Sequence, residues 1–386
     1  MIEPCTILVV DDEPDLETLI RQRFRRRIRK DEMRFVFAHD GVQALEALEG
    51  HPEIELIMTD INMPRMDGLT LLNELRTIRP KCRAVVVSAY GDMANIRTAM
   101  NRGAFDFVTK PIDFKDLELT IEKTMTHLAM MREALKHRAQ LLALHQELRV
   151  ARDMQMSILP QRFPSTSNAD THAIMTPAQD VGGDFYDVFH LPGEKLGVVM
   201  ADVSGKGVPA ALFMMVSRTL VKGNAVSALS PGDALTQVNN LLGEENERAM
   251  FVTLLFGIFD TENGTFTYAN AGHCAPYLVR SGQKPQELPL TQGIALGVMP
   301  DFPYTEDKVQ LQPGDRVFLY TDGVPEAEAP DKELFENHRL EETLAGMADR
   351  SPEEINRAVI EAVRVFSGGE HQSDDITCLT LAYRGS

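Results

Sequence analysis

The sequence predicts an α/β protein with two folded domains joined by a long helix, and three observations support this. Up to about residue 115, short apolar segments alternate with helical segments, which is typical of a doubly wound parallel sheet with helices on both faces. Between Asp113 and Pro160 there is no proline or glycine, and strong helix formers fill the interval. Farther on, strands come in hairpins and helices in separate blocks, which indicates an α/β sandwich of two antiparallel sheets flanked by helices.

The composition limits the classes of protein to which the chain can belong. Its 386 residues are 44% hydrophobic, enough for real cores, and we place domains at 1–120 and 161–386 with a helical linker at 121–160. No apolar run approaches the ~20 residues of a membrane span, and no segment reads as a signal peptide. Four widely spaced cysteines favour a reduced, cytoplasmic protein. The net charge of −18 argues against nucleic acid as a partner, and we expect the basic cluster at 21–30 to be a solvated helix face.

In the first domain, polar residues follow the predicted strands. The strands are expected at residues 6–10, 54–59, 84–87 and 105–109. A helix is entered through Pro14, and two more begin at Asp40 and Asp92, both of which can cap a helix N-terminus. Just past the strand ends lie five polar residues: Asp11, Asp12, Asp60, Ser88 and Lys110. Ligands bind at this edge of an open parallel sheet.

These five residues predict phosphoryl chemistry. Asp11, Asp12 and Asp60 can hold one Mg²⁺ while an oxygen of Asp60 remains free to attack a phosphoryl group. Lys110 would then neutralise charge on the transferred group, and Ser88 would donate a hydrogen bond to the acyl phosphate. Any one of these residues alone could be an ordinary cap or turn residue, but all five at one sheet edge favour a site.

The motifs at these positions resemble the receiver domain of two-component response regulators, over residues 5–120. They are Asp11-Asp12, Asp60 with Asn62-Met63-Pro64-Arg65-Met66-Asp67-Gly68, Ser88-Ala89 and Lys110-Pro111. The resemblance implies a flavodoxin-like sheet, Asp60 as the phosphoacceptor, and a sensor histidine kinase as the phosphodonor. It also implies that the backbone carbonyl of Asn62 binds the metal, and that Phe107 is a switch aromatic coupled to Ser88.

The linker shows a heptad pattern. Leu128, Leu135 and Leu142 recur every seven residues with Met131 between them, as a coiled-coil seam requires. The pattern then moves to Leu141, Leu144, Leu148 and Ala151, while Arg138 and His145 stand where the first pattern would put apolar residues. We expect a homodimer formed through this coiled coil; the alternative is a single helix docked along one domain. The stretch before Pro160 is similar to the helix that precedes certain bacterial phosphatase domains.

Four aspartates mark the second domain: Asp184, Asp202, Asp322 and Asp374. Each lies among small residues, and three of them border short apolar runs that predict strands, such as 196–201 and 316–320. An isolated Asp-Gly pair is usually a turn. Several buried carboxylates together repel one another and need a cation, and oxygen ligands suit Mg²⁺ or Mn²⁺. The sequence therefore favours a metal centre here.

Further strands and helices are expected around these aspartates. The other strands are predicted at 184–191, 195–201, 251–259, 265–269 and 376–382. The helices are predicted at 209–225, 231–245, 339–347 and 352–366.

The motifs of this domain resemble the bacterial branch of the metal-dependent PPM serine/threonine phosphatases. They are Gly182-Gly183-Asp184-Phe185-Tyr186-Asp187, Asp202-Val203-Ser204-Gly205-Lys206-Gly207, Asn270-Ala271-Gly272-His273, Thr321-Asp322-Gly323 and Asp374-Asp375-Ile376-Thr377. By resemblance, Asp202 bridges two Mn²⁺ or Mg²⁺ ions, Val203 supplies a carbonyl, and the other three aspartates complete the ligand shells. Two such ions can promote attack of water on a phosphoester without a covalent enzyme intermediate.

Two details stay open in this domain. The eukaryotic branch of the family has a histidine beside its bridging aspartate and an arginine that grips phosphate, and neither has a counterpart here, so the acid for the leaving group is unassigned. His273 is a candidate, although a turn residue is the better reading. The Gly205-Lys206-Gly207 segment does not complete a nucleotide loop, because the upstream glycine would fall at Met200.

Together these features predict a response regulator whose output is an enzyme. Phosphorylation of Asp60 would control a phosphoserine or phosphothreonine protein phosphatase. By resemblance, the substrate is a phosphorylated regulatory protein of the anti-sigma-factor antagonist type. The alternative is a catalytically weak phosphatase-like module that sequesters a regulatory partner. The sequence does not say whether phosphorylation raises or lowers activity.

Overall fold

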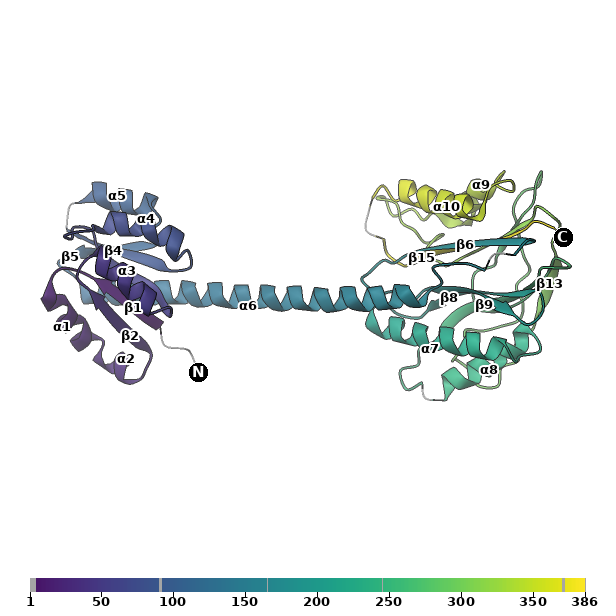
Figure 1. Cartoon of the computed structure of the whole chain (residues 1–386), viewed down its shortest axis with the longest axis horizontal. Helices are drawn as coiled ribbons and strands as arrows, with labels where there is room; N and C mark the ends of the chain where they lie inside the picture. Colours follow the sequence, from purple (N-terminus) through teal and green to yellow (C-terminus); the bar gives the residue numbers. More distant parts are fainter. Residues whose placement is uncertain (1–4, 90–91, 165, 245, 370–371, 386) are drawn as a thin grey trace. The chain divides into compact units, whose positions relative to one another are not determined.

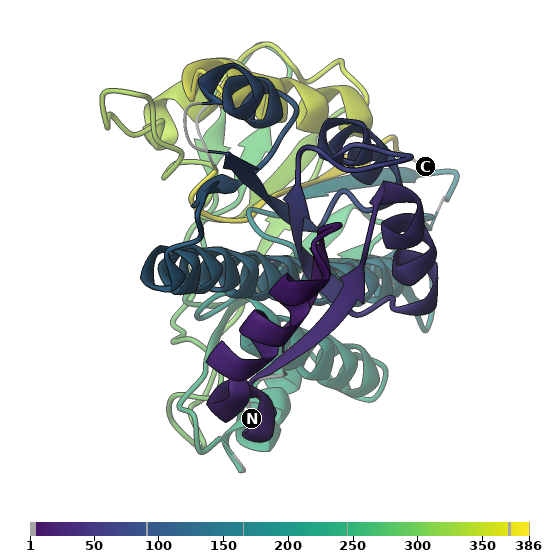
Figure 2. The same cartoon turned by 90° about the vertical axis from the view of Figure 1, so that its left-hand side faces the viewer.

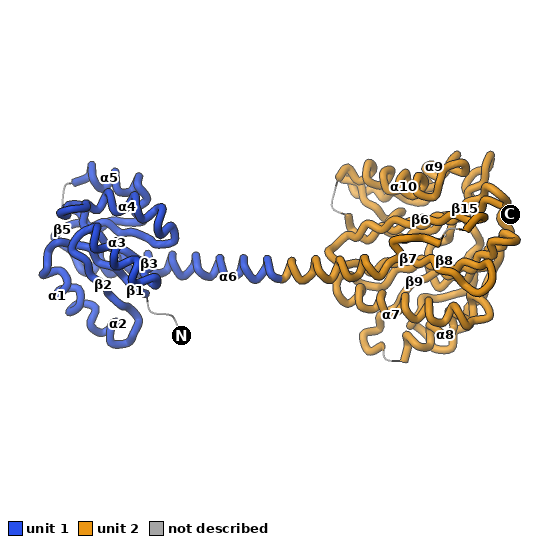
Figure 3. The backbone as a smooth tube through the Cα atoms, viewed as in Figure 1, with its two compact units in different colours: residues 1–143 blue, residues 144–386 orange. Residues whose placement is uncertain are grey.

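The computed structural model describes residues 5–89, 92–164, 166–244, 246–369 and 372–385. The chain divides into two compact units, Met1–Ala143 and Leu144–Ser386 (Figure 3). Helix α6 (Phe114–Ile158) is continuous and contributes residues to both units. No helix within these ranges is both long and apolar enough to cross a membrane.

The first unit contains a five-stranded sheet in which every pairing is parallel, in the order β2-β1-β3-β4-β5. Its strands are β1 (Cys5–Val10), β2 (Met33–Ala38), β3 (Ile54–Asp60), β4 (Arg83–Ala89) and β5 (Asp106–Lys110). Its helices, besides α6, are α1 (Pro14–Arg23), α2 (Arg25–Arg29), α3 (Gly41–Gly50), α4 (Gly68–Ile78) and α5 (Met93–Asn101).

Helices cover both faces of this sheet (Figures 1 and 2). Leu16 and Ile20 of α1 pack with Leu117 of α6 in the core on one face. Leu48 of α3 and Leu72 of α4 belong to the core on the other face. Burial on both faces explains the continuous apolar runs of the central strands. The predicted doubly wound, flavodoxin-like sheet is confirmed.

Three local features add detail to the sequence prediction. The helix that begins at Pro14 is interrupted at Phe24, whose 2% exposed ring is buried in the core. In the basic cluster, α2 has no buried residue, and Arg27 forms a partly exposed ion pair with Glu122 of α6 at 2.9 Å. Strand β2 was not anticipated, although residues 33–38 are mostly apolar; it lies at the sheet edge, where several of its residues are partly exposed.

The start of the predicted coiled-coil seam is wrong. Leu128 is only 4% exposed and belongs to the core of the first unit. Met131 also contacts this unit, since its sulfur accepts a hydrogen bond from Arg83 at 2.9 Å. These side chains stabilise the α/β domain, so they are not available to a partner helix.

Farther along α6, the apolar side chains are exposed. Leu135, Leu142 and Leu144 are 47%, 62% and 50% exposed. A dimeric coiled coil therefore remains a prediction for the stretch beyond Met131.

The second unit contains two five-stranded sheets, in the orders β13-β10-β9-β8-β7 and β12-β11-β14-β15-β6. The strands of the first are β7 (Phe185–Leu191), β8 (Lys195–Val203), β9 (Val252–Asp260), β10 (Thr265–Ala271) and β13 (Asp307–Gln310). Those of the second are β6 (Ala169–Thr176), β11 (Tyr277–Val279), β12 (Gln286–Glu287), β14 (Arg316–Tyr320) and β15 (Ile376–Tyr383). All their pairings are antiparallel.

Helices lie outside both sheets (Figure 1). The helices are α7 (Val208–Ala225), α8 (Pro231–Gly243), α9 (Glu336–Leu344) and α10 (Pro352–Phe366). Val199 of β8 and Leu379 of β15 belong to one core between the sheets. Leu340 of α9 and Val359 of α10 pack in a second core with Phe318 of β14. The predicted sandwich of antiparallel sheets is confirmed.

Most predicted elements of this unit agree with the structure within a few residues. The helix predicted at 231–245 ends at Gly243, and residue 245 lies outside the described residues. The sequence prediction missed strand β6, which pairs with β15 over its full length from Ala169 to Thr176. It also missed the short strands β11, β12 and β13.

Candidate functional site

The carboxyl edge of the parallel sheet brings together the acidic residues predicted for a receiver. Asp11 follows β1 directly, and Asp60 is the last residue of β3. One oxygen from each of Asp11, Asp12 and Asp60 lies within 4.8 Å of the others. An all-oxygen set of this size fits one Mg²⁺.

Lys110, the last residue of β5, points into this acidic cluster. Its Nζ lies 2.6 Å from Asp60 Oδ2, 2.9 Å from Asp11 Oδ2 and 3.0 Å from Glu13 Oε1. Although burial acts in the opposite direction, hydrogen bonds with these three carboxylates raise the pKa of Lys110. Burial, in turn, raises the pKa of Asp11. The lysine is therefore a fixed cation beside the proposed phosphoacceptor.

The other predicted receiver residues lie just after Asp60 and on the neighbouring strands β4 and β5. The hydroxyl of Ser88, fully buried in β4, has no hydrogen-bond partner among the described residues, so it is free to donate to a new group. The backbone N–H of Asn62 donates to Asp60 Oδ1 at 3.2 Å. The side chain of Phe107 in β5 is 36% exposed, an outward orientation for the residue proposed as a switch.

In the second unit, strand pairing brings the four predicted aspartates to one end of the two sheets. Asp184 precedes β7, and Asp202 lies near the end of β8, which pairs antiparallel with β7. Asp322 follows β14, and Asp374 precedes β15, which pairs antiparallel with β14. Each sheet thus contributes one aspartate from each of two adjacent strands.

Two threonines connect the sheets at this end. Thr321 and Thr377, beside β14 and in β15, both donate their hydroxyls to Oδ2 of Asp184, at 2.7 and 2.5 Å. Burial and the nearby charges of Asp202 and Asp375 raise the pKa of Asp184 well above its usual range. This side chain is fixed by both sheets and carries an electrostatic strain that a cation would relieve.

The same physical causes act on the neighbouring carboxyls. Burial, followed by the charges of Asp322 and Asp374, raises the pKa of Asp202 to about 7. Burial also raises the pKa of Asp322. The oxygen donors fit Mg²⁺ or Mn²⁺. Among the described residues, the Asp11 cluster is the only one in which three acidic groups have oxygens within 4.8 Å of one another. The four aspartates of the second unit are therefore spaced more widely than the Asp11 cluster. Wider spacing is compatible with ligands of two ions ~3.5–4 Å apart.

Glycine is required beside Asp184 because other groups approach the backbone closely. A Cβ atom on Gly183 would lie 2.8 Å from the carbonyl oxygen of Val203, so this carbonyl, predicted to be a metal ligand, faces the Asp184 loop. A Cβ atom on Gly182 would lie 2.1 Å from Oδ2 of Asp375. The Gly182-Gly183-Asp184 motif thus reflects packing as well as chemistry.

Asp375 is an important residue that the sequence prediction missed. Its Oδ1 accepts a hydrogen bond from the N–H of Ala178 at 2.8 Å. Its Oδ2 accepts bonds from the N–H groups of Gly183 and Asp184 at 2.8 and 3.4 Å. Only 6% exposed, Asp375 holds the loop that carries Asp184, whereas its neighbour Asp374 is more exposed. Its position beside Asp374 in the motif was a usable signal.

Gln155 of α6 was also missed, and nothing in the sequence of a uniform helix marks it out. Its side chain is 1% exposed and bonds to the backbone of Gly182. The end of α6 is therefore part of the support of the acidic site.

His273 is buried, and its hydrogen bonds to described residues go to Thr253 and Asn270 rather than to the four aspartates. Its Nδ1 is 2.9 Å from Thr253 Oγ1, and its backbone N–H donates to Asn270 Oδ1 at 2.7 Å. Burial lowers the pKa of His273 to about 4, so the imidazole is neutral at ordinary pH. These contacts fit a turn residue and argue against a proton donor to the leaving group.

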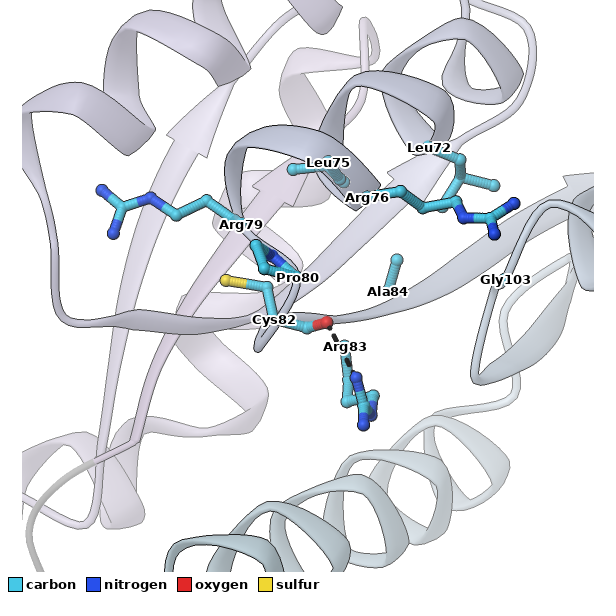
Figure 4. Close-up of a pocket in the computed structure, with 9 residues that line it drawn as sticks. All are labelled: Leu72, Leu75, Arg76, Arg79, Pro80, Cys82, Arg83, Ala84 and Gly103. Atoms are coloured by element: carbon cyan, nitrogen blue, oxygen red, sulfur yellow. Dashed lines mark hydrogen bonds between the residues drawn. The ribbon is translucent and has the colours of Figure 1, made fainter. Parts of the chain in front are cut away.

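A cavity of about 260 Å³ in the first unit is unrelated to either acidic site. It lies at the start of β4, whereas Asp60 stands at the opposite, carboxyl edge of the sheet. Figure 4 shows that Arg76, Arg79 and Arg83 around it point away from one another. Such side chains do not converge on an anion.

Two family models match the sequence. One, described as the response regulator receiver domain, matches residues 7–122. The other, described as stage II sporulation protein E (SpoIIE), matches residues 192–384, which is half of the chain. The second match includes Asp202, Asp322 and Asp374 and begins after Asp184.

Known proteins resemble parts of the chain. Protein IcfG of Synechocystis sp. is 33% identical over 263 residues, covering 61% of this chain and 41% of its own length. Phosphoserine phosphatase RsbU of Bacillus subtilis is 29% identical over 200 residues, covering 50% and 59%. The chain thus spans about half the length of these curated relatives. The solved SiaA-PP2C domain of Pseudomonas aeruginosa superposes with a TM-score of 0.56 and 25% identity, covering 64% of this chain and 99% of that one.

Proposed function

The chain belongs to the SpoIIE family and carries a receiver domain before the family domain, and on that premise we propose that it is a metal-dependent protein phosphatase controlled by its receiver. The substrate group is phosphoserine or phosphothreonine. RsbU, a relative over half of this chain, is named a phosphoserine phosphatase, which supports this choice.

The observation that carries the proposal is the convergence of Asp184, Asp202, Asp322 and Asp374 at one end of two sheets. Raised pKa values at three of these residues mean that burial and mutual repulsion disfavour their charged forms in the absence of a cation. Among the described residues, Asp374 is the only one of the four that pairs with a basic side chain, Lys206, whereas a purely structural cluster would pair its carboxylates with basic side chains throughout.

Asp184, Asp202, Asp322, Asp374 and the carbonyl of Val203 would hold two Mn²⁺ or Mg²⁺ ions. When bound, such ions supply Lewis-acid activation of water and neutralise charge on the phosphate. The chain contributes orientation: Thr321 and Thr377 fix Asp184. In the reaction, the oxygen of water bonds to phosphorus, the bond from phosphorus to the serine oxygen breaks, and the proton lost by water balances the one gained by serine. The products are a free hydroxyl and inorganic phosphate.

In the receiver, we propose that Asp60 accepts a phosphoryl group from a sensor histidine kinase. Asp11, Asp12, an oxygen of Asp60 and the carbonyl of Asn62 would hold Mg²⁺. Lys110, already 2.6 Å from Asp60, would neutralise the phosphoryl group, and the unpartnered hydroxyl of Ser88 would bond to it. Rearrangement of Ser88 and Phe107 would then change the surface of the receiver.

For the natural substrate, we propose a small regulatory protein of the anti-sigma-factor antagonist type, dephosphorylated in a partner-switching pathway. The alternative is a phosphatase-like module that binds such a protein without hydrolysing it. The presence of all four aspartates, three of them with raised pKa values, supports the enzyme.

One experiment separates these functions. The purified full chain is given a phosphoserine protein or peptide with Mn²⁺, with Mg²⁺ or with chelator, and released phosphate is measured. We expect metal-dependent hydrolysis that Asp202→Asn lowers by about 10³-fold or more, and that exposed Asp349→Asn leaves unchanged. Binding of the phosphoprotein with no turnover under any metal would instead establish the sequestering module.

A further inference from the structure

Among the described residues, one basic side chain forms an ion pair with the acidic site: Lys206. Its Nζ lies 2.9 Å from Oδ2 of Asp374 and donates a hydrogen bond to the carbonyl oxygen of Ser373 at 2.5 Å. Its charge also acts on Asp202, and it lowers the pKa of Asp322. No other ion pair between described residues includes one of the four aspartates.

The local backbone positions this lysine beside the acidic site. Lys206 lies in the loop between β8, which carries Asp202, and α7. The glycines on either side, Gly205 and Gly207, have φ values of +88° and +73°, a conformation that other residues rarely adopt. Nothing but solvent lies within 4 Å of where a Cβ atom on Gly205 would be, so backbone conformation rather than space requires glycine there.

Lys206 is both charged and accessible. A lysine side chain in contact with a carboxylate and solvent carries an ammonium group at physiological pH. The side chain of Lys206 is 47% exposed, whereas Asp184 in the same acidic site is 1% exposed. A ligand that approaches the carboxylates from solvent would therefore meet the ammonium group.

We propose that Lys206 contacts the phosphate oxygens of the substrate in this site, an inference that rests on the proposed function. A phosphomonoester dianion that enters a ring of carboxylates needs positive charge beyond that of the metal ions. The ammonium of lysine binds phosphate as a compact point charge. In hydrolysis, the lysine keeps its proton and forms no bond; it stabilises negative charge on oxygens that do not leave.

The competing explanation is that Lys206 only holds Asp374 in place. Both roles use the same ion pair, but they affect different measurements. A phosphate contact governs the affinity for substrate and for inorganic phosphate. A support for Asp374 governs the affinity for metal. Partly exposed pairs such as this one contribute little to stability, so substitution should leave the fold intact.

The test compares the full-length wild type with Lys206→Met, Lys206→Arg and the control Lys195→Met, which changes an exposed lysine at the opposite end of β8. Calorimetry measures the binding of Mg²⁺, and then of inorganic phosphate to the Mg²⁺-loaded protein. Turnover of p-nitrophenyl phosphate supplies KM and kcat. These measurements report metal affinity, anion affinity and catalysis separately.

We expect Lys206→Met to weaken phosphate binding and raise KM by about tenfold or more, the loss for one charged hydrogen bond. Mg²⁺ affinity should change by less than about threefold, since an exposed pair is weak. Lys206→Arg should recover part of the loss, and Lys195→Met should match the wild type.

Other outcomes would overturn either this inference or the proposed function. Weaker Mg²⁺ binding by Lys206→Met with unchanged phosphate binding would make Lys206 a support for Asp374, and no change in any measurement would make it a surface residue. If the wild type is active and Lys206→Met is equally active, the inference about Lys206 is refuted, but the proposed phosphatase function is still supported. Inactive wild type with phosphate binding that depends on Lys206 would refute the phosphatase and leave the phosphate contact standing.

Discussion

The side-chain amide of Gln155 forms two hydrogen bonds with the backbone of Gly182. Its Nε2 donates to the Gly182 carbonyl oxygen at 2.6 Å, and its Oε1 accepts from the Gly182 N–H at 3.1 Å. Gln155 belongs to α6, and Gly182 lies two residues before Asp184. The helix that leaves the receiver therefore ends in direct contact with the loop that carries an acidic residue of the proposed active site.

Replacing Gln155 should weaken both catalysis and folding. We expect Gln155→Ala to lower kcat/KM by about tenfold because the Asp184 loop loses its support, and to lower the unfolding free energy because two buried hydrogen bonds are worth roughly 1 kcal/mol each. Exposed Gln140→Ala, on the same helix, should have no effect. Kinetics together with thermal melting checks this, and equal activity of the two variants would contradict it.

The adjacent residues Asp374 and Asp375 should respond in opposite ways to replacement by alanine. Asp375→Ala leaves the N–H groups of Ala178 and Gly183 without partners, so the metal-free protein should lose about 2 kcal/mol or more of unfolding free energy. Asp374→Ala should abolish activity, yet change that free energy by less than about 1 kcal/mol, since its pair with Lys206 is partly exposed. Urea unfolding and phosphatase assays measure both, and a reversed order would refute the division of roles.

The acidic site should make metal-free stability depend on pH. Burial and neighbouring charges raise the folded pKa of Asp202 to about 7, far above the ordinary value of 3.8. The folded state thus binds more protons than the unfolded state between these values, so the unfolding free energy should fall as pH rises through this window. Added Mg²⁺ should stabilise the protein more at pH 8 than at pH 6.

Thermal melting of Asp202→Asn supplies the control for this pH dependence. The variant carries no ionisable group at this position, so its melting temperature should fall less between pH 5 and 8 than that of the wild type. An identical slope in both proteins would show that other groups dominate.

Phosphorylation of the receiver should change the phosphatase rate. Acetyl phosphate or a beryllofluoride mimic should modify Asp60, whose Oδ2 lies 2.6 Å from Lys110, and Asp60→Ala should not respond. Ser88→Ala should still accept the phosphoryl group and yet transmit less of the change, because its hydroxyl is the free donor beside the site. An unchanged rate in wild type at full phosphorylation would leave the receiver without its proposed role.

If the exposed part of α6 pairs with a second copy, regulation should depend on the heptad phase. Seven residues inserted after Gln140 restore the same helix face and should preserve regulation. Three or four inserted residues turn the face by about half a heptad and should fix the activity high or low whatever the state of Asp60. Normal responses from both insertions would show that α6 is only a tether.

The local sequence determined the architecture of both units. Apolar runs such as 54–59 and 196–201 are strands because burial on two faces leaves few polar positions, and caps such as Asp40 and Ser351 set helix starts. The motifs also identified the four aspartates, because each lies at or near the end of a strand. The pairing of these strands then decides which residues become its neighbours.

Tertiary structure decided what local patterns cannot encode. Leu128 has the spacing of a coiled-coil residue, yet it lies in the receiver core, since a helical stripe does not specify which surface it meets. Asp375 and Gln155 support Asp184 through backbone hydrogen bonds that join segments 27 to 192 residues apart. Such contacts depend on where the folded chain brings unpaired N–H and C=O groups, and those groups are the same in every residue except proline. The sequence therefore does not show which backbone groups Asp375 and Gln155 meet, although the position of Asp375 beside Asp374 was a signal.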